Sequence, residues 1–158
     1  MTTKNDAALR DHLRKALDSD NAHLKFDDAV SDFSAAIRGR RPKGGPHSAW
    51  ELLEHLRITL SDILEFSRNP KHVSPEFPAG YWPGSEAPSN DGAWDESVVA
   101  YRKDLREFAE LVADESVDLY SPIPHGDGQT ILREVLLAID HNAYHLGQLV
   151  SVRRSLEP

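Results

Sequence analysis

Four stretches of the sequence repeat apolar residues every three or four positions, the spacing that places them on one side of an α-helix. The stretches cover residues 6–19, 48–69, 95–114 and 130–154. A further apolar run at helical spacing, residues 26–37, could restart the first helix after a break at Asp20 and Asn21. No stretch alternates apolar and polar residues for long enough to predict a strand. We therefore expect an all-α fold, a four-helix bundle that forms a single domain over residues 1–158.

The predicted helices are bounded by residues that cap or break them. Ser48 stands three positions before Glu51, which is the capping-box spacing, and so opens the second helix. Asp127 or Thr130 can open the last helix. Between the second and third helices, the segment Pro70 to Asp91 contains five prolines. A connection of this length in a compact domain is a lid, a packed excursion or a binding element.

Charge and composition exclude several classes of protein. The chain has 18 Lys and Arg against 26 Asp and Glu, a net charge of −8, which disfavours a nucleic-acid partner. It has no Cys, so it can form no disulfide, no thiolate metal ligand and no Cys nucleophile. No apolar run approaches the ~20 residues that cross a bilayer, and the first residues lack the apolar region of a signal peptide. We expect a cytoplasmic protein without a membrane partner.

Three of the eight histidines fall on apolar faces of the predicted helices. His141 and His145 are four residues apart, so both imidazoles lie on the core-facing side of the last helix. Two imidazoles at this spacing can bind one divalent cation, and His55, among leucines in the second helix, is the candidate third ligand. Three nitrogens would leave a coordination position open for water or substrate. The competing interpretation is one buried histidine bonded to a carbonyl and one exposed histidine, with no metal.

The residues around these histidines limit the chemistry. Asn142 follows His141, so the sequence lacks the glutamate that serves as general base in HExxH proteases. Acidic residues near enough in sequence to accept hydrogen bonds from the imidazoles are Glu51, Glu54, Asp62 and Asp140. The capping box explains Glu51 equally well.

Two further histidines and three aromatic residues have open roles. His47 and His125 each follow a proline and precede a helix, so either could approach the open end of the metal site or simply be an exposed turn residue. Tyr81, Trp82 and Trp94 lie in or just after the Pro-rich segment. They could cover the mouth of a pocket, but we favour the interpretation that they pin the segment to the helices.

Three segments of the chain resemble the DinB-like (damage-inducible) superfamily. They are the helix start SAWELLEHL at Ser48 to Leu56, the turn SPIPHGDGQT at Ser121 to Thr130, and DHNAYHLGQL at Asp140 to Leu149. The most specific feature is one histidine in the second helix, followed in the last helix by HxxxH and Gly-Gln. The resemblance covers essentially the whole chain.

This resemblance implies a four-helix bundle, frequently a homodimer, with a three-histidine site for Ni²⁺, Zn²⁺ or a related divalent metal. The ligands of the family correspond here to His55, His141 and His145. Some relatives are thiol-dependent S-transferases or isomerases, and others are described as metal-dependent hydrolases. The implied function is a metal that activates water or a thiol, with a small-molecule thiol or electrophile as substrate. The alternative is a non-catalytic, dimeric metal-binding or stress-associated protein.

Overall fold

The computed structural model describes residues 4–18 and 22–157, and all regular elements within them are helical, which confirms the predicted all-α fold. The long helices are α1 (Lys4–Leu17), α3 (Ala49–Arg68), α4 (Ala93–Ala113) and α5 (Ile131–Leu156). The short ones are α2 (Phe26–Val30) and the 3₁₀ helices η1 (Ala35–Ile37) and η2 (Ala79–Tyr81). None of the helices in these ranges has the length and apolar character needed to cross a membrane.

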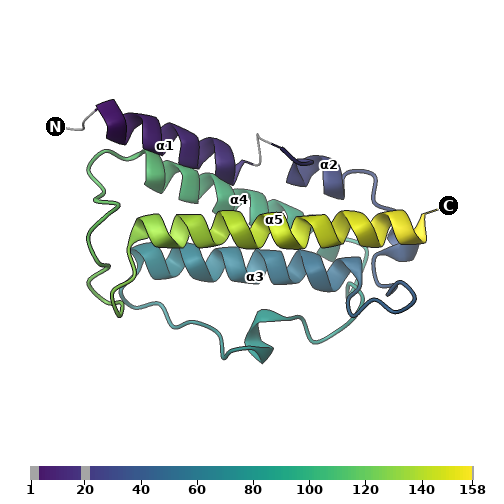
Figure 1. Ribbon diagram of the computed structural model, residues 1–158. Coiled ribbons are helices and arrows are strands. Elements are labelled where there is room, and N and C mark those ends of the chain that lie inside the picture. The colour runs from purple at the N-terminus through teal and green to yellow at the C-terminus, as the bar shows by residue number, and fades with distance from the viewer. Residues whose placement is uncertain (1–3, 19–21, 158) are drawn as a thin grey trace.

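The four long helices lie side by side (Figure 1). α3 packs against both α4 and α5, and α1 packs against the same two helices. The buried apolar residues of all four form one continuous core, in which Leu53, Phe108 and Leu149 are fully buried. This arrangement places the two predicted histidine-bearing helices, α3 and α5, in direct contact.

The apolar run 26–37 differs from a simple restart of the first helix. It forms α2, a bend and η1, because Asp32 adopts a positive φ of 53° that no α-helix accommodates. Its apolar residues are nevertheless buried, among them Phe26, Phe33 and Ile37. The periodicity therefore identified residues that face the core, although the backbone between them is broken. The proposed break at Asp20 and Asn21 lies outside the described residues.

The helix starts follow their capping residues. The Ser48 side chain accepts a hydrogen bond from the Glu51 backbone N–H, and the Glu51 carboxylate accepts one from the Ser48 backbone N–H, which confirms the capping box. At α5 it is Thr130, and not Asp127, whose side chain accepts a hydrogen bond from the Arg133 backbone N–H. α3 therefore begins at a fixed position six residues before His55.

The segment between α3 and α4 runs along the outside of α3 (Figure 1). One carboxylate on α3, Asp62, holds it at two points. The Tyr81 hydroxyl donates a hydrogen bond of 2.7 Å to Asp62 Oδ2, and His72 Nε2 lies 2.7 Å from Asp62 Oδ1. Together with α4 and α5, this segment encloses the first turns of α3, where every residue from Ala49 to Leu56 is buried.

Candidate metal centre

The three histidines that the sequence singles out lie together between α3 and α5. His55 Nε2 and His141 Nε2 are 3.0 Å apart. One ring nitrogen from each of His55, His141 and His145 lies within 4.8 Å of the other two. Within residues 4–18 and 22–157, no other group of three or more His, Asp or Glu side chains lies close enough together to hold a metal ion. The structure thus brings together all three predicted ligands.

His55 is held by the segment that follows α3. It is buried, with 8% of its surface exposed, and its Nδ1 lies 2.8 Å from the Tyr81 carbonyl oxygen. Because a carbonyl can only accept, Nδ1 carries the proton and Nε2 presents a lone pair to the cluster. The His55 ring also stacks on Trp82, with centroids 3.9 Å apart and planes at 1°. The tautomer and the orientation of His55 are therefore both fixed.

His145 is oriented by a side chain of its own helix. Its Nδ1 lies 2.7 Å from Gln148 Oε1, so the amide oxygen accepts the N–H and leaves Nε2 as the lone-pair nitrogen. Gln148 belongs to the same apolar stripe as both histidines of α5. The Gly-Gln that follows HxxxH thus has a physical role, since a metal-ligating imidazole is usually held by an acceptor on its other nitrogen.

The local environment keeps the cluster uncharged. Burial lowers the pKa of His141 to about 4, and the neighbouring histidines add to this effect. Burial likewise lowers the pKa of His145 to about 4, with His55 contributing. The pKa of His55 is also lowered, mainly by burial, against the opposing hydrogen bond to the Tyr81 carbonyl. At neutral pH all three imidazoles are neutral, the form that binds metals.

The donor set fits a divalent transition-metal ion. Metal–nitrogen bonds of about 2.0–2.1 Å place two ligand nitrogens about 2.9 Å apart in an octahedral site and about 3.3 Å apart in a tetrahedral one. The 3.0 Å between His55 Nε2 and His141 Nε2 lies within this range and is also the length of a hydrogen bond between the two rings, while the full set of three nitrogens spans up to 4.8 Å. Three imidazoles without a thiolate suit zinc or nickel better than magnesium or calcium, which prefer oxygen ligands.

The four acidic residues considered as partners of the imidazoles make other contacts or lie on the surface. Glu51 completes the capping box and binds Arg41. Glu54 binds Arg57 and accepts a hydrogen bond from Ser97. Asp140 is exposed. Asp62 contacts no imidazole of the cluster, but it accepts a hydrogen bond from the Tyr81 hydroxyl, and the Tyr81 carbonyl orients His55. The partners are thus a backbone carbonyl and an amide, and a carbonyl from a distant segment leaves no signature in the sequence.

The other residues whose roles the sequence leaves open lie either beside the histidine cluster or away from it. His47 stacks on Trp82, with centroids 4.1 Å apart, and so lies beside the cluster. His125 lies near the other end of α3, where its Nε2 is 2.6 Å from the Phe66 carbonyl oxygen. Trp94 is 1% exposed within the core and covers no pocket mouth. Of the three aromatic residues in question, Tyr81 and Trp82 thus belong to the site.

Most of the chain matches the model of one known protein family. The family model described as the DinB superfamily matches residues 8–149, a range that contains all three histidines and Gln148. The comparisons with curated proteins and with solved structures found no significant match.

Proposed function

Because the chain belongs to the DinB superfamily, we propose that His55, His141 and His145 bind one divalent ion, Ni²⁺ or Zn²⁺, within a four-helix bundle of the DinB type. We further propose that the bound ion serves a reaction in which water attacks a small substrate or a thiol is transferred to it. The observation that carries this proposal is the convergence of three neutral imidazoles, two of which, His55 and His145, have their other ring nitrogen held by an acceptor outside the cluster.

The chemistry that this donor set favours follows from its charge. A divalent ion held by three neutral imidazoles keeps its full charge and lowers the pKa of a bound water or thiol. The protein contributes the positions of the nitrogens. The Tyr81 carbonyl and Gln148 hold the N–H groups of His55 and His145, while Trp82 covers one face of His55.

A groove beside the cluster offers a path for a small substrate. It has a volume of about 360 Å³, and its lining includes His47, Leu52, Tyr144 and Gln148. Tyr144 is 65% exposed and meets the His145 ring edge-on, with centroids 4.9 Å apart. The wall of the groove thus includes Gln148, which orients His145, and the apolar residues Leu52 and Val152 in the same wall suit a substrate with an apolar part.

One observation favours the non-catalytic alternative. The described acidic residues nearest in sequence to His55 are occupied, Glu51 by Arg41 and Glu54 by Arg57. Without a carboxylate directed at the cluster, a bound ion would still tie α3 to α5 and stabilise the fold.

Elemental analysis tests the metal site. Untagged protein is stripped with a chelator, incubated with Zn²⁺ or Ni²⁺ and dialysed. We expect one ion per chain in the wild type and none in His145→Ala, with the exposed His12→Ala as the matched control. Equal stoichiometry in wild type and His145→Ala would refute the site.

Turnover distinguishes the enzyme from the metal-binding alternative. The reconstituted protein is incubated with a low-molecular-weight thiol and a chromogenic electrophile, and separately with activated esters. Metal-dependent product formation that His145→Ala abolishes supports the enzyme. One bound ion without turnover in either assay supports the non-catalytic protein.

A further inference from the structure

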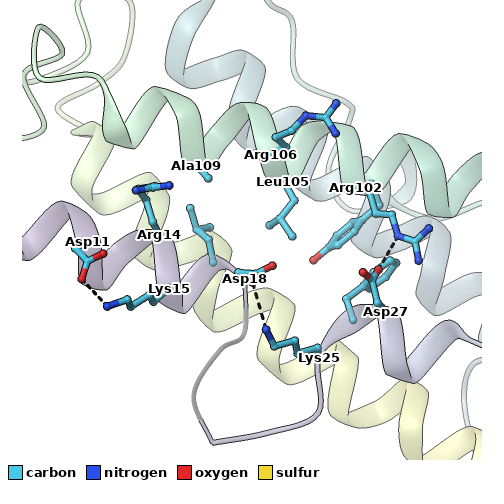
Figure 2. A pocket seen from close by; sticks show the side chains of 13 residues that line it. Asp11, Arg14, Lys15, Asp18, Lys25, Asp27, Arg102, Leu105, Arg106 and Ala109 are labelled. Carbon is cyan, nitrogen blue, oxygen red and sulfur yellow. Dashed lines mark hydrogen bonds and ion pairs between the residues drawn. The ribbon is translucent and has the colours of Figure 1, made fainter.

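A second pocket lies on another side of the molecule, between the end of α1, α2 and α4 (Figure 2). Its volume of about 540 Å³ falls within the range of small-molecule sites. None of its lining residues belongs to the histidine cluster or to the groove beside it. Neither the family membership nor the proposed metal chemistry gives this pocket a role.

Charged side chains surround the pocket, with an excess of cations. The basic residues in its lining are Arg14, Lys15, Lys25, Arg102 and Arg106, and the acidic ones are Asp11, Asp18 and Asp27. Each acidic residue pairs with one cation, Asp11 with Lys15, Asp18 with Lys25 and Asp27 with Arg102. On a chain of net charge −8, this pocket is therefore a locally basic site.

The two remaining arginines, Arg14 and Arg106, lie outside these ion pairs, although Arg14, after Lys15, contributes to lowering the pKa of Asp11. The guanidinium groups of Arg14 and Arg106 make no ion pair or hydrogen bond with any other residue that the structure describes, and both side chains are exposed. Figure 2 shows that Arg14 comes from α1 and Arg106 from α4. Because neither is held by a carboxylate, both long side chains are free to turn toward an anion at the mouth of the pocket.

A tyrosine in the lining has a buried ring and a hydroxyl that is free to donate a hydrogen bond into the pocket. Tyr101 is 3% exposed and its ring stacks on Phe26, with centroids 4.1 Å apart. Its hydroxyl makes no hydrogen bond within residues 4–18 and 22–157 and is not among the fully buried polar atoms there, so it is accessible from the pocket that Tyr101 lines. Burial raises the pKa of Tyr101 well above its usual value, so the phenol stays protonated and can donate a hydrogen bond to an acceptor that enters the pocket.

The rest of the lining is apolar. Leu17 and Phe26 are almost completely buried beneath the pocket, and Leu105 and Ala109 of α4 are half-buried along it. Contact with hydrocarbon buries this apolar surface and favours binding. An inorganic ion would bury none of it and would not be favoured in this way. The lining therefore combines an apolar surface with donors for an anionic group.

We propose that this pocket binds a small organic anion with an apolar body, of which a medium-chain carboxylate is the simplest example. The hydrocarbon lies along Leu17, Phe26 and Leu105. The carboxylate accepts a hydrogen bond from the Tyr101 hydroxyl and forms ion pairs with Arg14 and Arg106. This inference is independent of the proposed metal chemistry, because the two sites share no residue.

Amide chemical shifts measured during titration with decanoate test the proposal. The protein is stripped of metal, so that the carboxylate cannot bind through a metal ion, and His145→Ala is titrated in parallel. We expect saturation at about 1 mM or tighter, with the shifts concentrated in α1, α2 and α4. Decan-1-ol should bind at least tenfold more weakly and decyltrimethylammonium more weakly still. Equal binding of the three compounds, no saturation, or shifts centred on the groove of His47 and Gln148 would overturn the proposal.

Two sets of variants locate the donors. The double variant Arg14→Gln/Arg106→Gln should weaken decanoate at least tenfold, and Tyr101→Phe, which keeps the stacked ring, about threefold to tenfold. The matched control Arg40→Gln/Arg154→Gln changes the net charge equally at exposed arginines outside the pocket. The affinity of this control variant for decanoate should stay within about twofold of the wild-type affinity. An equal loss in the control, or wild-type affinity in both test variants, would show that these groups do not bind the anion.

Discussion

Two buried polar centres of the molecule satisfy their hydrogen bonds in opposite ways. The first is Arg10 on α1, which is 6% exposed. Its Nη1 donates to the carbonyl oxygens of Val112 and Asp114 at 2.8 and 2.9 Å, its Nη2 to that of Val117 at 2.8 Å, and its Nε to Asp6 at 2.8 Å. One guanidinium thus caps the end of α4 and fixes the turn that follows. This centre is complete within the chain.

The histidine cluster is incomplete by the same criterion. His55 and His145 both direct their N–H groups away from the cluster and present lone pairs to it. His141 Nε2 lies 3.0 Å from His55 Nε2 and can donate one hydrogen bond to it, but His141 Nδ1 is then left buried without a hydrogen-bond partner among the described residues. The comparison indicates that Arg10 finds its partners within the chain, whereas the histidine cluster leaves a buried nitrogen unpartnered and brings together three imidazoles that could hold a metal ion.

The largest loss of Zn²⁺ affinity is expected when the histidine cluster loses one of its ligands. His141→Ala should weaken Zn²⁺ binding by more than about 100-fold, because a lost ligand costs more than the 10- to 100-fold typical of an outer partner. The metal-free stability should change by about 1 kcal/mol or less, since the fold does not depend on this imidazole. Competition with a chromogenic chelator and urea unfolding measure the two quantities. Unchanged affinity would remove His141 from the site.

The opposite pattern is expected at Arg10. Arg10→Met leaves buried carbonyl oxygens without donors and should lower the free energy of unfolding by about 3 kcal/mol. The metal stoichiometry should remain that of the wild type. Arg14→Met, one turn further along α1, has no such partners and should cost less than about 0.5 kcal/mol. Equal urea midpoints for these two variants would contradict the assigned role of Arg10.

A smaller effect is expected when the orientation of a ligand is changed. Gln148→Ala removes the acceptor of His145 Nδ1 and should weaken Zn²⁺ binding about 10- to 100-fold. Gln148→Glu keeps an acceptor in place and should recover most of the affinity. Ser151→Ala, on the exposed side of the same helix, serves as the control. If Gln148→Ala binds Zn²⁺ as tightly as the control, the hydrogen bond does not orient His145 for the metal.

The smallest expected effect on Zn²⁺ affinity concerns Glu51. It distinguishes the two roles that the sequence leaves open for this residue, the capping box and an acceptor for an imidazole N–H. Glu51→Ala should lower the free energy of unfolding by about 1 kcal/mol through loss of the capping box. Its Zn²⁺ affinity should stay within about twofold of wild type, because the carboxylate binds Arg41 and Ser48 and not an imidazole. A tenfold loss of affinity would place Glu51 in the metal site after all.

The sequence was sufficient for features that repeat along one helix. Apolar spacing located the long helices, Ser48 with Glu51 located the start of α3, and the HxxxH spacing placed His141 and His145 on the core side of α5. These features depend on residues within a few positions of one another, so local geometry determines them.

The features that the sequence did not reveal depend on the backbone of distant segments. The Tyr81 carbonyl that orients His55 lies 26 residues away, and the carbonyl oxygens bound by Arg10 lie more than 100 residues away. A carbonyl oxygen is present at every residue, so no residue type marks it as a partner. For the same reason, Arg10 was indistinguishable from the other charged residues of α1 in the sequence.

Urea unfolding with and without Zn²⁺ tests most directly the claim that one buried centre is complete and the other is not. The experiment compares the wild type, Arg10→Met and His145→Ala. At free Zn²⁺ of 100 times the wild-type Kd, the wild type and Arg10→Met should each gain about 2.7 kcal/mol over their chelator-treated forms, and His145→Ala should gain almost nothing. An equal gain in His145→Ala, or no gain in the wild type, would contradict the account.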